Sequence, residues 1–449
     1  HYDFIIESLL DLNIELSIYE TEVVCLEDDA LPAFEILHEM FGIEAIYSTE
    51  EIGIDVTYAR DKAMQKFCKA HSIDWVECQY NGVLRGLKNR DGWSRKWYTF
   101  MKKPISKYEA QTSSFVSGEI RKGVYKKLKQ FQLHGKNHSF QKGGRTEALK
   151  WKSSFFKERI AHYSDSISKP LASRYGCSRL SPYFAWGNLS IREVYQEALK
   201  LKKESDYKRQ INAFLSRLRW QAHFIQKFEM EPRMEFEAIN RGFLSLEHPL
   251  NKEYVEAWKS GQTGYPLVDA SIRCVKKTGY INFRMRSMIT SFLTHHLFQH
   301  FSTIGAWLAR QFLDFEPGIH YGQMQMQSGL TGYNTVRVYN PTKNAKDHDP
   351  EAAFIKEYVP ELKNLPTHLA IEPWLATKME SELYKFELEK DYFKPIVDIS
   401  ETRKIALTKL YGHRKEELSK SEKARILKKH TIPRKPKDSS KVKKVSRKE

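Results

Sequence analysis

Hydrophobic and polar positions between residues 13 and 80 repeat with two different periods. Short apolar runs typical of strands occur at IELSIY (14–19), EAIYST (44–49) and DWVECQ (74–79). Amphipathic stretches with a helical repeat, at about 32–41 and 56–70, separate them. Strands that alternate with helices form a parallel sheet with right-handed crossovers. The pattern therefore predicts an α/β, Rossmann-like domain at the start of the chain, although no G-x-G-x-x-G is present.

The rest of the chain changes character twice. From residue 81 the apolar repeat weakens and Lys, Gly and Ser become frequent, whereas from about 144 the apolar spacing is helical almost throughout. We expect four parts: a partial α/β domain at 1–100, a connector at 101–143, a large all-α domain at 144–411 and a tail at 412–449. No internal repeat of fixed period is visible.

The positive charge is concentrated at the end of the chain. The whole sequence has 73 Lys and Arg against 56 Asp and Glu, a net charge of +17, and 412–449 alone has fifteen basic and five acidic residues. This segment has few apolar residues and no helical stripe after about Leu427, which predicts disorder. Such a tail either solubilises the protein or attracts phosphate groups. A nuclear-targeting role stays open for a eukaryotic host.

Composition excludes several classes of protein. No apolar run approaches the roughly 18 residues of a membrane span, so we expect a soluble, cytoplasmic protein without membrane contact. The five cysteines are widely spaced and form no C-x-x-C, which argues against a disulfide framework or a cysteine-only zinc site. The chain begins on a helix-like apolar pattern with no initiator Met, and we expect that it starts inside the α/β domain.

The segment YGCSRLSPYFAWGNLS (175–190) predicts the start of a helix with polar groups around it. Ser178 and Ser181 flank this start, and Pro182 occupies a position that favours the first helical turn. Hydroxyls and free backbone N–H groups at such a point suit an anion. An ordinary helix cap has the same signature.

Two later segments carry further polar groups. In 261–287 a turn precedes an apolar helix that contains Arg284 and Arg286, and buried arginines need partners or a ligand because an unpaired buried charge is costly. The segment 313–350 is rich in Gly and Asn and predicts a long polar loop. Its acidic and histidine side chains have a weak spacing for metal ligands, so we expect no metal; they are Asp314, Glu316 and His320.

Together these segments resemble the photolyase/cryptochrome flavoprotein family. The resemblance covers nearly the whole chain and is most specific in SRLSPY and TGYPLVDA. The matching motifs are TYARD (57–61), NGVLRGLKNRDGWSRKW (81–97), GG (143–144), SRLSPY (178–183), FLSRLRW (214–220), TGYPLVDA (263–270), YNP (339–341) and PIVD (395–398).

The resemblance implies an α/β antenna domain, a helical domain that binds FAD, and blue-light-driven electron transfer to a pyrimidine dimer in DNA. The antenna chromophore stays unknown. By position, Arg286 and Asp314 match the pair beside the flavin ring and His320 the residue that faces flavin N5. Trp220 matches the tryptophan that stacks on the flipped dimer. The implied FAD contacts are Tyr163, Ser178, Leu180, Ser181, Arg286, Asp314, Phe315, Glu316 and His320, and the implied DNA contacts are Arg217, Trp220, Phe283, Lys343 and Asn344.

The chain also departs from the family's pattern. Arg217 replaces a glutamate that hydrogen-bonds the dimer, and Phe283 replaces an asparagine that contacts it. Two members of the family's electron-transfer tryptophan triad fall on Phe301 and Met324, which are poor redox relays. The nearby aromatic alternatives are Trp307, Tyr321 and Tyr333.

Three functions remain open at this point. The first is a monomeric, nucleoid-associated photolyase with catalytic roles for Trp220, Arg286, Asp314 and His320, acting on cyclobutane dimers. The second is a cryptochrome-like photoreceptor without repair, which the two substituted dimer contacts and the basic tail favour. Repair of the (6-4) photoproduct is weaker, because the only paired histidines, His295 and His296, lie on the wrong segment.

Overall fold

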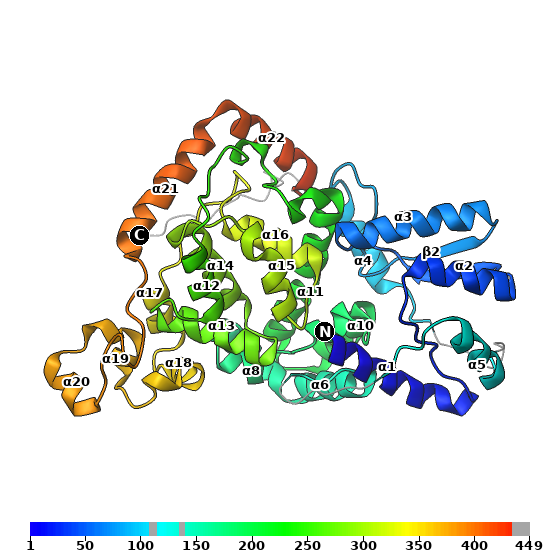
Figure 1. The fold of residues 1–449 in the computed structure, drawn as a ribbon, viewed down its shortest axis with the longest axis horizontal. Helices are drawn as coiled ribbons and strands as arrows, with labels where there is room; N and C mark the ends of the chain where they lie inside the picture. The colour runs from blue at the N-terminus through cyan, green and yellow to red at the C-terminus, as the bar shows by residue number, and fades with distance from the viewer. Residues whose placement is uncertain (107–114, 134–139, 433–449) are drawn as a thin grey trace, which may run out of the picture.

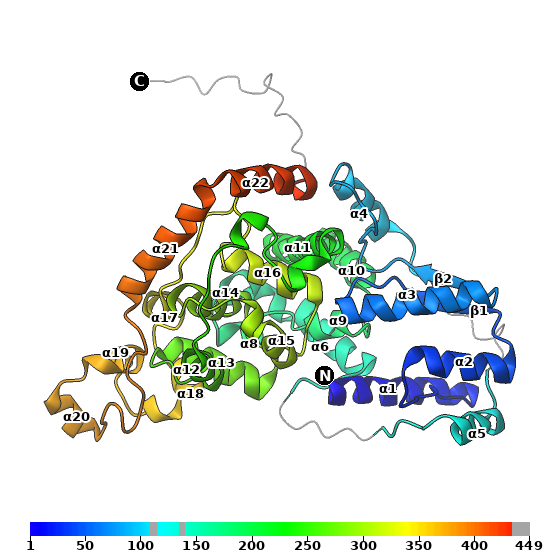
Figure 2. The same ribbon diagram turned by 45° about the horizontal axis from the view of Figure 1, so that its top comes forward.

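The computed structural model describes residues 1–106, 115–133 and 140–432, and most of them are helical. Figure 1 shows a small α/β part, which carries the N-terminal helices, beside a larger body of helices. Two long helices, α21 (Ile399–Lys415) and α22 (Glu417–His430), run along one edge of that body. Figure 2 shows α22 ending close to α4 (Trp93–Lys102).

The α/β part confirms two of the three predicted strands. β1 (Ala45–Thr49) and β2 (Asp74–Cys78) pair in parallel, with Ala45 opposite Asp74 and Thr49 opposite Cys78. The crossover between them is α3 (Asp55–Ala70), which buries Met64, Phe67 and Cys68. The other helices of this part are α1 (Tyr2–Leu16), α2 (Ala30–Phe41), α4 and α5 (Gly118–Lys127).

The strand predicted at 14–19 is wrong. α1 continues to Leu16 and a 3₁₀ turn covers Ser17–Tyr19. Its apolar residues do not form one face of a sheet, since Ile14 and Ile18 are about three-quarters exposed while Phe4 and Ile6 are buried. Among the described residues the sheet therefore has two strands, and a wider Rossmann-like sheet stays a prediction.

Helices make up the remaining body. Four short ones follow α6 (Arg145–Lys157) in a region rich in turns: η3 (Arg159–His162), α7 (Tyr163–Ser166), α8 (Ala172–Gly176) and α9 (Ser181–Ala185). The α-helices of the body continue with α10 (Ile191–Glu204), α11 (Lys208–Met230), α12 (Lys252–Ser260), α13 (Pro266–Thr278), α14 (Phe283–Ser291), α15 (Ser302–Gln311), α16 (Pro317–Gln327), α17 (Pro341–His348), α18 (Ala353–Tyr358), α19 (Thr367–Ile371) and α20 (Lys378–Tyr384). Shorter turns are η4 (Pro232–Glu235), η5 (Arg241–Phe243), the π-helical η6 (Phe292–His296), η7 (Pro360–Leu362) and η8 (Pro373–Leu375).

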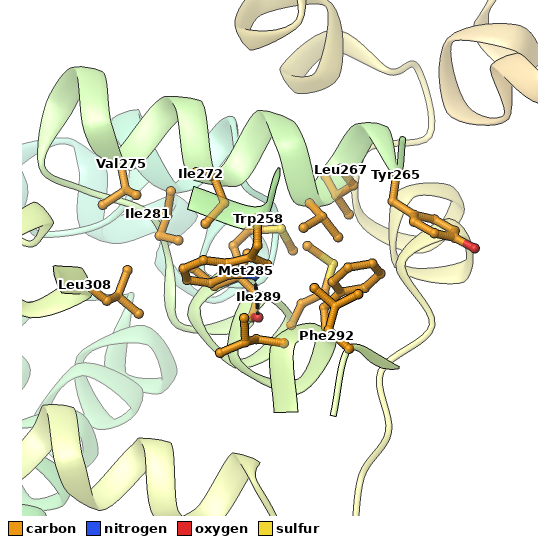
Figure 3. Packing of buried hydrophobic residues seen from close by; sticks show 14 of the residues in the cluster. Trp258, Tyr265, Leu267, Ile272, Val275, Ile281, Met285, Ile289, Phe292 and Leu308 are labelled. Carbon is orange, nitrogen blue, oxygen red and sulfur yellow. Dashed lines mark hydrogen bonds between the residues drawn. The ribbon is translucent and has the colours of Figure 1, made fainter. Parts of the chain in front are cut away.

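The largest apolar core lies between α12, α13, α14 and α15 (Figure 3). Trp258 is fully buried there, and its indole N–H donates to the carbonyl of Ile289 at 3.1 Å. The TGYPLVDA motif closes one end of this core. The buried carboxylate of Asp269 accepts from the backbone N–H groups of Thr263 and Gly264, at 2.9 and 3.1 Å, and holds the turn that starts α13.

Half of the predicted polar loop at 313–350 is helical, which corrects the prediction for that half. α16 and α17 both lie within it. Helical propensity alone does not explain α16, which contains two glycines; tertiary packing does. A Cβ on Gly318 would lie 2.5 Å from the Cα of Ile225, so glycine allows α16 to pack directly on α11.

The predicted disorder of 412–449 is also wrong over the part that the structure describes. Residues 412–430 belong to α21 and α22 except for Glu416 between them, and 433–449 lie outside the described residues. Charged contacts rather than an apolar stripe dock α22. The buried carboxylate of Glu231 accepts from His430 Nε2 and from Arg425 Nη1, both at 3.0 Å, and Ile426 is fully buried.

Candidate active site

The predicted pair of Arg286 and Asp314 forms. Asp314 follows α15, and one terminal nitrogen of Arg286, on α14, donates to both carboxylate oxygens at 2.9 Å. Nε of Arg286 donates to the carbonyl of Ile281 at 3.0 Å, and its guanidinium lies 4.0 Å from the centre of the Phe312 ring. The carboxylate side chain is 7% exposed and the arginine 23%, so the pair sits at the edge of the interior.

His320 is a neutral histidine of defined tautomer. Burial lowers its pKa to about 4, although the hydrogen bond to Gly305 favours the charged form. Because the Gly305 carbonyl can only accept, Nε2 carries the proton and donates over 2.9 Å. Nδ1 is thereby left as an acceptor. The ring lies among aromatic neighbours, with Phe315 at 5.4 Å and Tyr321 at 4.9 Å between ring centroids.

Glu316 is a carboxyl group that can exchange a proton near neutral pH. It is the N-cap residue of α16. Burial raises its pKa to about 7, against the hydrogen bond from the backbone N–H of Gly318, and the charge of Glu51 adds to the shift. Glu51 belongs to the α/β part, so a negative charge in that part contributes to the raised pKa of Glu316.

Three arginines lie in or beside the SRLSPY motif, and none of them was among the predicted site residues. Arg159 donates to the carbonyls of Cys177 and, at 3.4 Å, Ser178. Arg179 stacks 3.6 Å from the centre of the Tyr280 ring, and Arg174 donates to the Tyr280 carbonyl at 3.4 Å. Arg179 stands inside the motif and was detectable there, whereas nothing in its local sequence marks Arg159.

The charges of this arginine group are poorly compensated. Burial, followed by repulsion from Arg179, lowers the pKa of Arg159 to about 10. Burial likewise lowers the pKa of Arg179, and Arg174 adds to the effect. The Nε atoms of both Arg159 and Arg179 are buried without a hydrogen-bond partner. An anion beside Ser178 would relieve this repulsion and fill the empty donor positions.

Other predicted FAD contacts lie in the same packed region. Tyr163 and Leu180 belong to one buried cluster together with Phe214 of α11. Ser181 is the first residue of α9, as predicted, and Pro182 follows it. The hydroxyl of Ser178 accepts from the N–H of Leu180 at 3.5 Å. The region therefore joins α7, α9 and α11 around the arginine group.

α11 presents an aromatic and basic surface. Trp220 is 47% exposed, and its ring lies 5.3 Å from His223 and 5.9 Å from Phe224. Arg217, one turn earlier, is exposed. A tryptophan so exposed leaves a large apolar surface in water, which is typical of a binding surface.

The other predicted DNA contacts are more scattered. Phe283, the first residue of α14, is 47% exposed. Lys343 lies on α17 and lines a surface hollow of about 740 Å³ together with Tyr265 and Trp374. Asn344 is buried, and its amide donates to the carbonyl of Asn340 at 2.8 Å. Asn344 would reach DNA only if α17 were uncovered.

Comparisons with known proteins find similarity to photolyases and cryptochromes. Residues 214–412 match the family model for the FAD binding domain of DNA photolyase. The deoxyribodipyrimidine photo-lyase of Alkalihalophilus pseudofirmus is 27% identical over 93% of this chain and 89% of its own. Cryptochrome DASH of Gloeobacter violaceus is 29% identical over 58% of this chain and 52% of its own. The class III photolyase of Agrobacterium tumefaciens has a TM-score of 0.75 at 20% identity, over 92% of this chain and 89% of its own.

The chain is similar to proteins of the photolyase/cryptochrome family in sequence and in fold. Its cofactor is FAD. The residues present fit that group, because the unpartnered arginine donors beside Ser178 suit a diphosphate. If the flavin ring lies where the resemblance implies, the pair of Arg286 and Asp314 would hold a charge beside it. Within the described residues, no three His, Cys, Asp or Glu side chains are placed to hold a metal ion, and no helix is long and apolar enough to cross a membrane.

The route of electron transfer to the flavin stays a prediction, and the structure shows only where the residues named for it lie. Phe301 and Met324 are both buried. Trp307 packs against Trp258, with ring centroids 5.7 Å apart, and Tyr321 stacks on Phe228 at 5.9 Å. The hydroxyl of Tyr333 accepts from Lys227 at 3.2 Å and is thus tied to α11.

Proposed function

We propose that this protein is a light-driven, FAD-dependent photolyase that acts on cyclobutane pyrimidine dimers in DNA. The observation that carries the proposal is the exposed indole of Trp220 on the FAD-binding domain, beside the cation of Arg217. A flipped base needs a flat apolar surface to stack on, and Trp220 offers one. The names of the relatives add support, since several are photo-lyases.

The chain's own residues have separable parts in this proposal. Reduced FAD, when bound and excited, supplies the electron that splits the dimer and takes it back. Arg286 holds a positive charge at the flavin edge, and Asp314 keeps that charge in one orientation. His320, neutral and fixed by Gly305, offers a hydrogen-bond acceptor rather than a second cation. Trp220 positions the lesion, and Arg217 binds a phosphate close to it.

The test measures repair directly. The protein with FAD reduced is mixed with an oligonucleotide that contains one pyrimidine dimer, and dimer loss is followed under blue light and in darkness. We expect loss in light only. Trp220→Ala should weaken lesion binding about 5- to 150-fold, the value of one base stacked on an aromatic ring, with FAD retained. Tyr47→Ala, at a 74% exposed aromatic on β1, is the matched control and should change nothing.

A cryptochrome-like photoreceptor is the second candidate. Relatives named cryptochrome DASH match over about half of the chain, and the exposed Arg217 and Phe283 stand where the family's dimer contacts would lie. Absence of dimer loss in a preparation that retains FAD and responds to blue light would favour this function and refute the repair proposal.

A further inference from the structure

α4 is a helix with one buried and one basic side. Trp93, Trp97 and Met101 are fully buried along one side. The exposed side and the residue that follows the helix carry only basic charges, since residues 93–103 contain no Asp or Glu; these charges belong to Arg95, Lys96, Lys102 and Lys103. None of the four forms an ion pair with another residue in the described part of the chain.

This basic surface is joined to the surface that holds Trp220. Tyr98 of α4 accepts a hydrogen bond from Arg219 at 3.2 Å, and Arg219 also lies over the Tyr98 ring at 6.0 Å. Trp93 of α4 packs against His223 at 6.1 Å, and His223 in turn packs against Trp220. These contacts place α4 against α11 between residues 219 and 223.

We propose that the exposed side of α4, defined by Arg95, Lys96, Lys102 and Lys103, binds the DNA backbone on one side of the lesion. This inference rests on the proposed function. Residues 95 to 103 span about 12 Å of helix, the rise of three to four base pairs, so the four cations can follow consecutive phosphates. The pair of Tyr98 and Arg219 links this track to Trp220. The occupant is a phosphate backbone because four uncompensated cations on one side attract an anionic polymer.

The test uses the full chain with FAD and a fourfold variant, Arg95→Gln, Lys96→Gln, Lys102→Gln and Lys103→Gln. A control variant changes four exposed lysines around α20, at the far end of the body in Figure 1: Lys378→Gln, Lys385→Gln, Lys390→Gln and Lys394→Gln. Both variants lose the same charge. Binding to a 30-base-pair duplex, with and without one dimer, is measured between 50 and 200 mM salt.

Loss of four phosphate contacts should lower the slope of log affinity against log salt by about 3.6. Over the fourfold salt range, the affinity of the α4 variant should then fall about 150-fold less than that of the wild type. The ratio of damaged to undamaged binding should stay within about twofold, because phosphate contacts carry no lesion information. The α20 control should keep the wild-type slope.

The outcomes separate this inference from the proposed function. A wild-type slope in the α4 variant, or an equal change in the α20 control, overturns the α4 surface while lesion preference and repair stand. A lowered slope in the α4 variant, together with no lesion preference in the wild type, supports the surface and refutes the repair function. If the variant instead loses binding to anionic vesicles and keeps its DNA slope, α4 faces lipid and the inference fails.

Discussion

Replacing Asp314 by Asn removes the only carboxylate that hydrogen-bonds Arg286 among the described residues. Removal of one partner from a buried ion pair costs about 3 to 5 kcal/mol, because the other charge stays buried. Arg286 is 23% exposed and keeps its bond to the Ile281 carbonyl, so water and that carbonyl compensate in part. We therefore expect about 2 kcal/mol, a factor of about 30 in the ratio of folded to unfolded protein.

The assay is urea unfolding of the FAD-free protein, followed by near-ultraviolet circular dichroism, with titration of FAD as a second measurement. Asp347→Asn is the matched control. Asp347 pairs with Lys343 at 3.3 Å, but the side chains are 47% and 74% exposed, and such a pair contributes little. If Asp314→Asn changes the free energy of unfolding and the affinity for FAD no more than Asp347→Asn does, the pair is not a buried anchor and its proposed role beside the flavin fails.

Three further predictions concern Glu316, Gly318 and Glu231. Because burial raises the pKa of Glu316 to about 7, the folded state binds a proton more tightly than the unfolded state, so stability should fall as pH rises from about 4.5 to 7 and level off above. This fall amounts to about 3 kcal/mol in the free energy of unfolding, and Glu316→Gln should abolish it when unfolding is measured as a function of pH. An unchanged pH profile would contradict the burial of Glu316. Gly318→Ala should cost about 1 to 3 kcal/mol and loosen FAD, because the new methyl group meets Ile225, whereas Gly412→Ala on α21, with open space around it, should be stabilising; equal effects would disprove the close packing. Glu231→Gln removes the carboxylate that holds His430, Arg425 and Lys429, so hydrogen exchange in α22 should quicken while α20 stays unchanged. Slow exchange retained in α22 would show that Ile426 and its apolar neighbours dock the helix without these charges.

Sequence periodicity predicted those elements whose local pattern agrees with their surroundings. More exposed and less exposed residues alternate along most of β1 and along β2, and α3, which connects the two strands, has an apolar stripe. The same reasoning failed at residues 14–19, since an apolar run with a period near two also occurs at the end of a helix whose last turn is exposed. Nothing in a local window distinguishes the two cases.

The predictions for the segments that form α16 and α22 were wrong for a different reason. Their helical state depends on distant partners, the backbone of α11 for α16 and the carboxylate of Glu231 for α22. From the local sequence a glycine predicts a break in a helix. Gly318 is favourable within α16 only because the backbone at Ile225 approaches it too closely for a side chain. Run-length and propensity arguments therefore assign such segments to loops.

The residues of the candidate site likewise divide into those that could be predicted from the sequence and those that could not. The resemblance placed Arg286 and Asp314 together although 28 positions separate them, and the hydrogen bonds agree. It did not identify Arg159, whose position beside Ser178 arises from the fold of η3 and α8 and not from a motif. A family pattern predicts contacts that recur among its members, such as the pair of Arg286 and Asp314. The uncompensated charge of Arg159 can be recognised only in the structure, from its burial and its missing hydrogen-bond partner.

α11 connects the two halves of the proposed activity. Its exposed side carries Trp220, and its buried side is the surface on which Gly318 allows α16 to rest. α16 in turn follows Glu316, its N-cap residue, and contains His320. A displacement of α16 would therefore change the distance between the proposed flavin site and the proposed stacking surface, and the proposed electron transfer is sensitive to that distance. Glycine at this contact fixes the separation more firmly than a larger side chain, because backbone meets backbone and no flexible side chain lies between them.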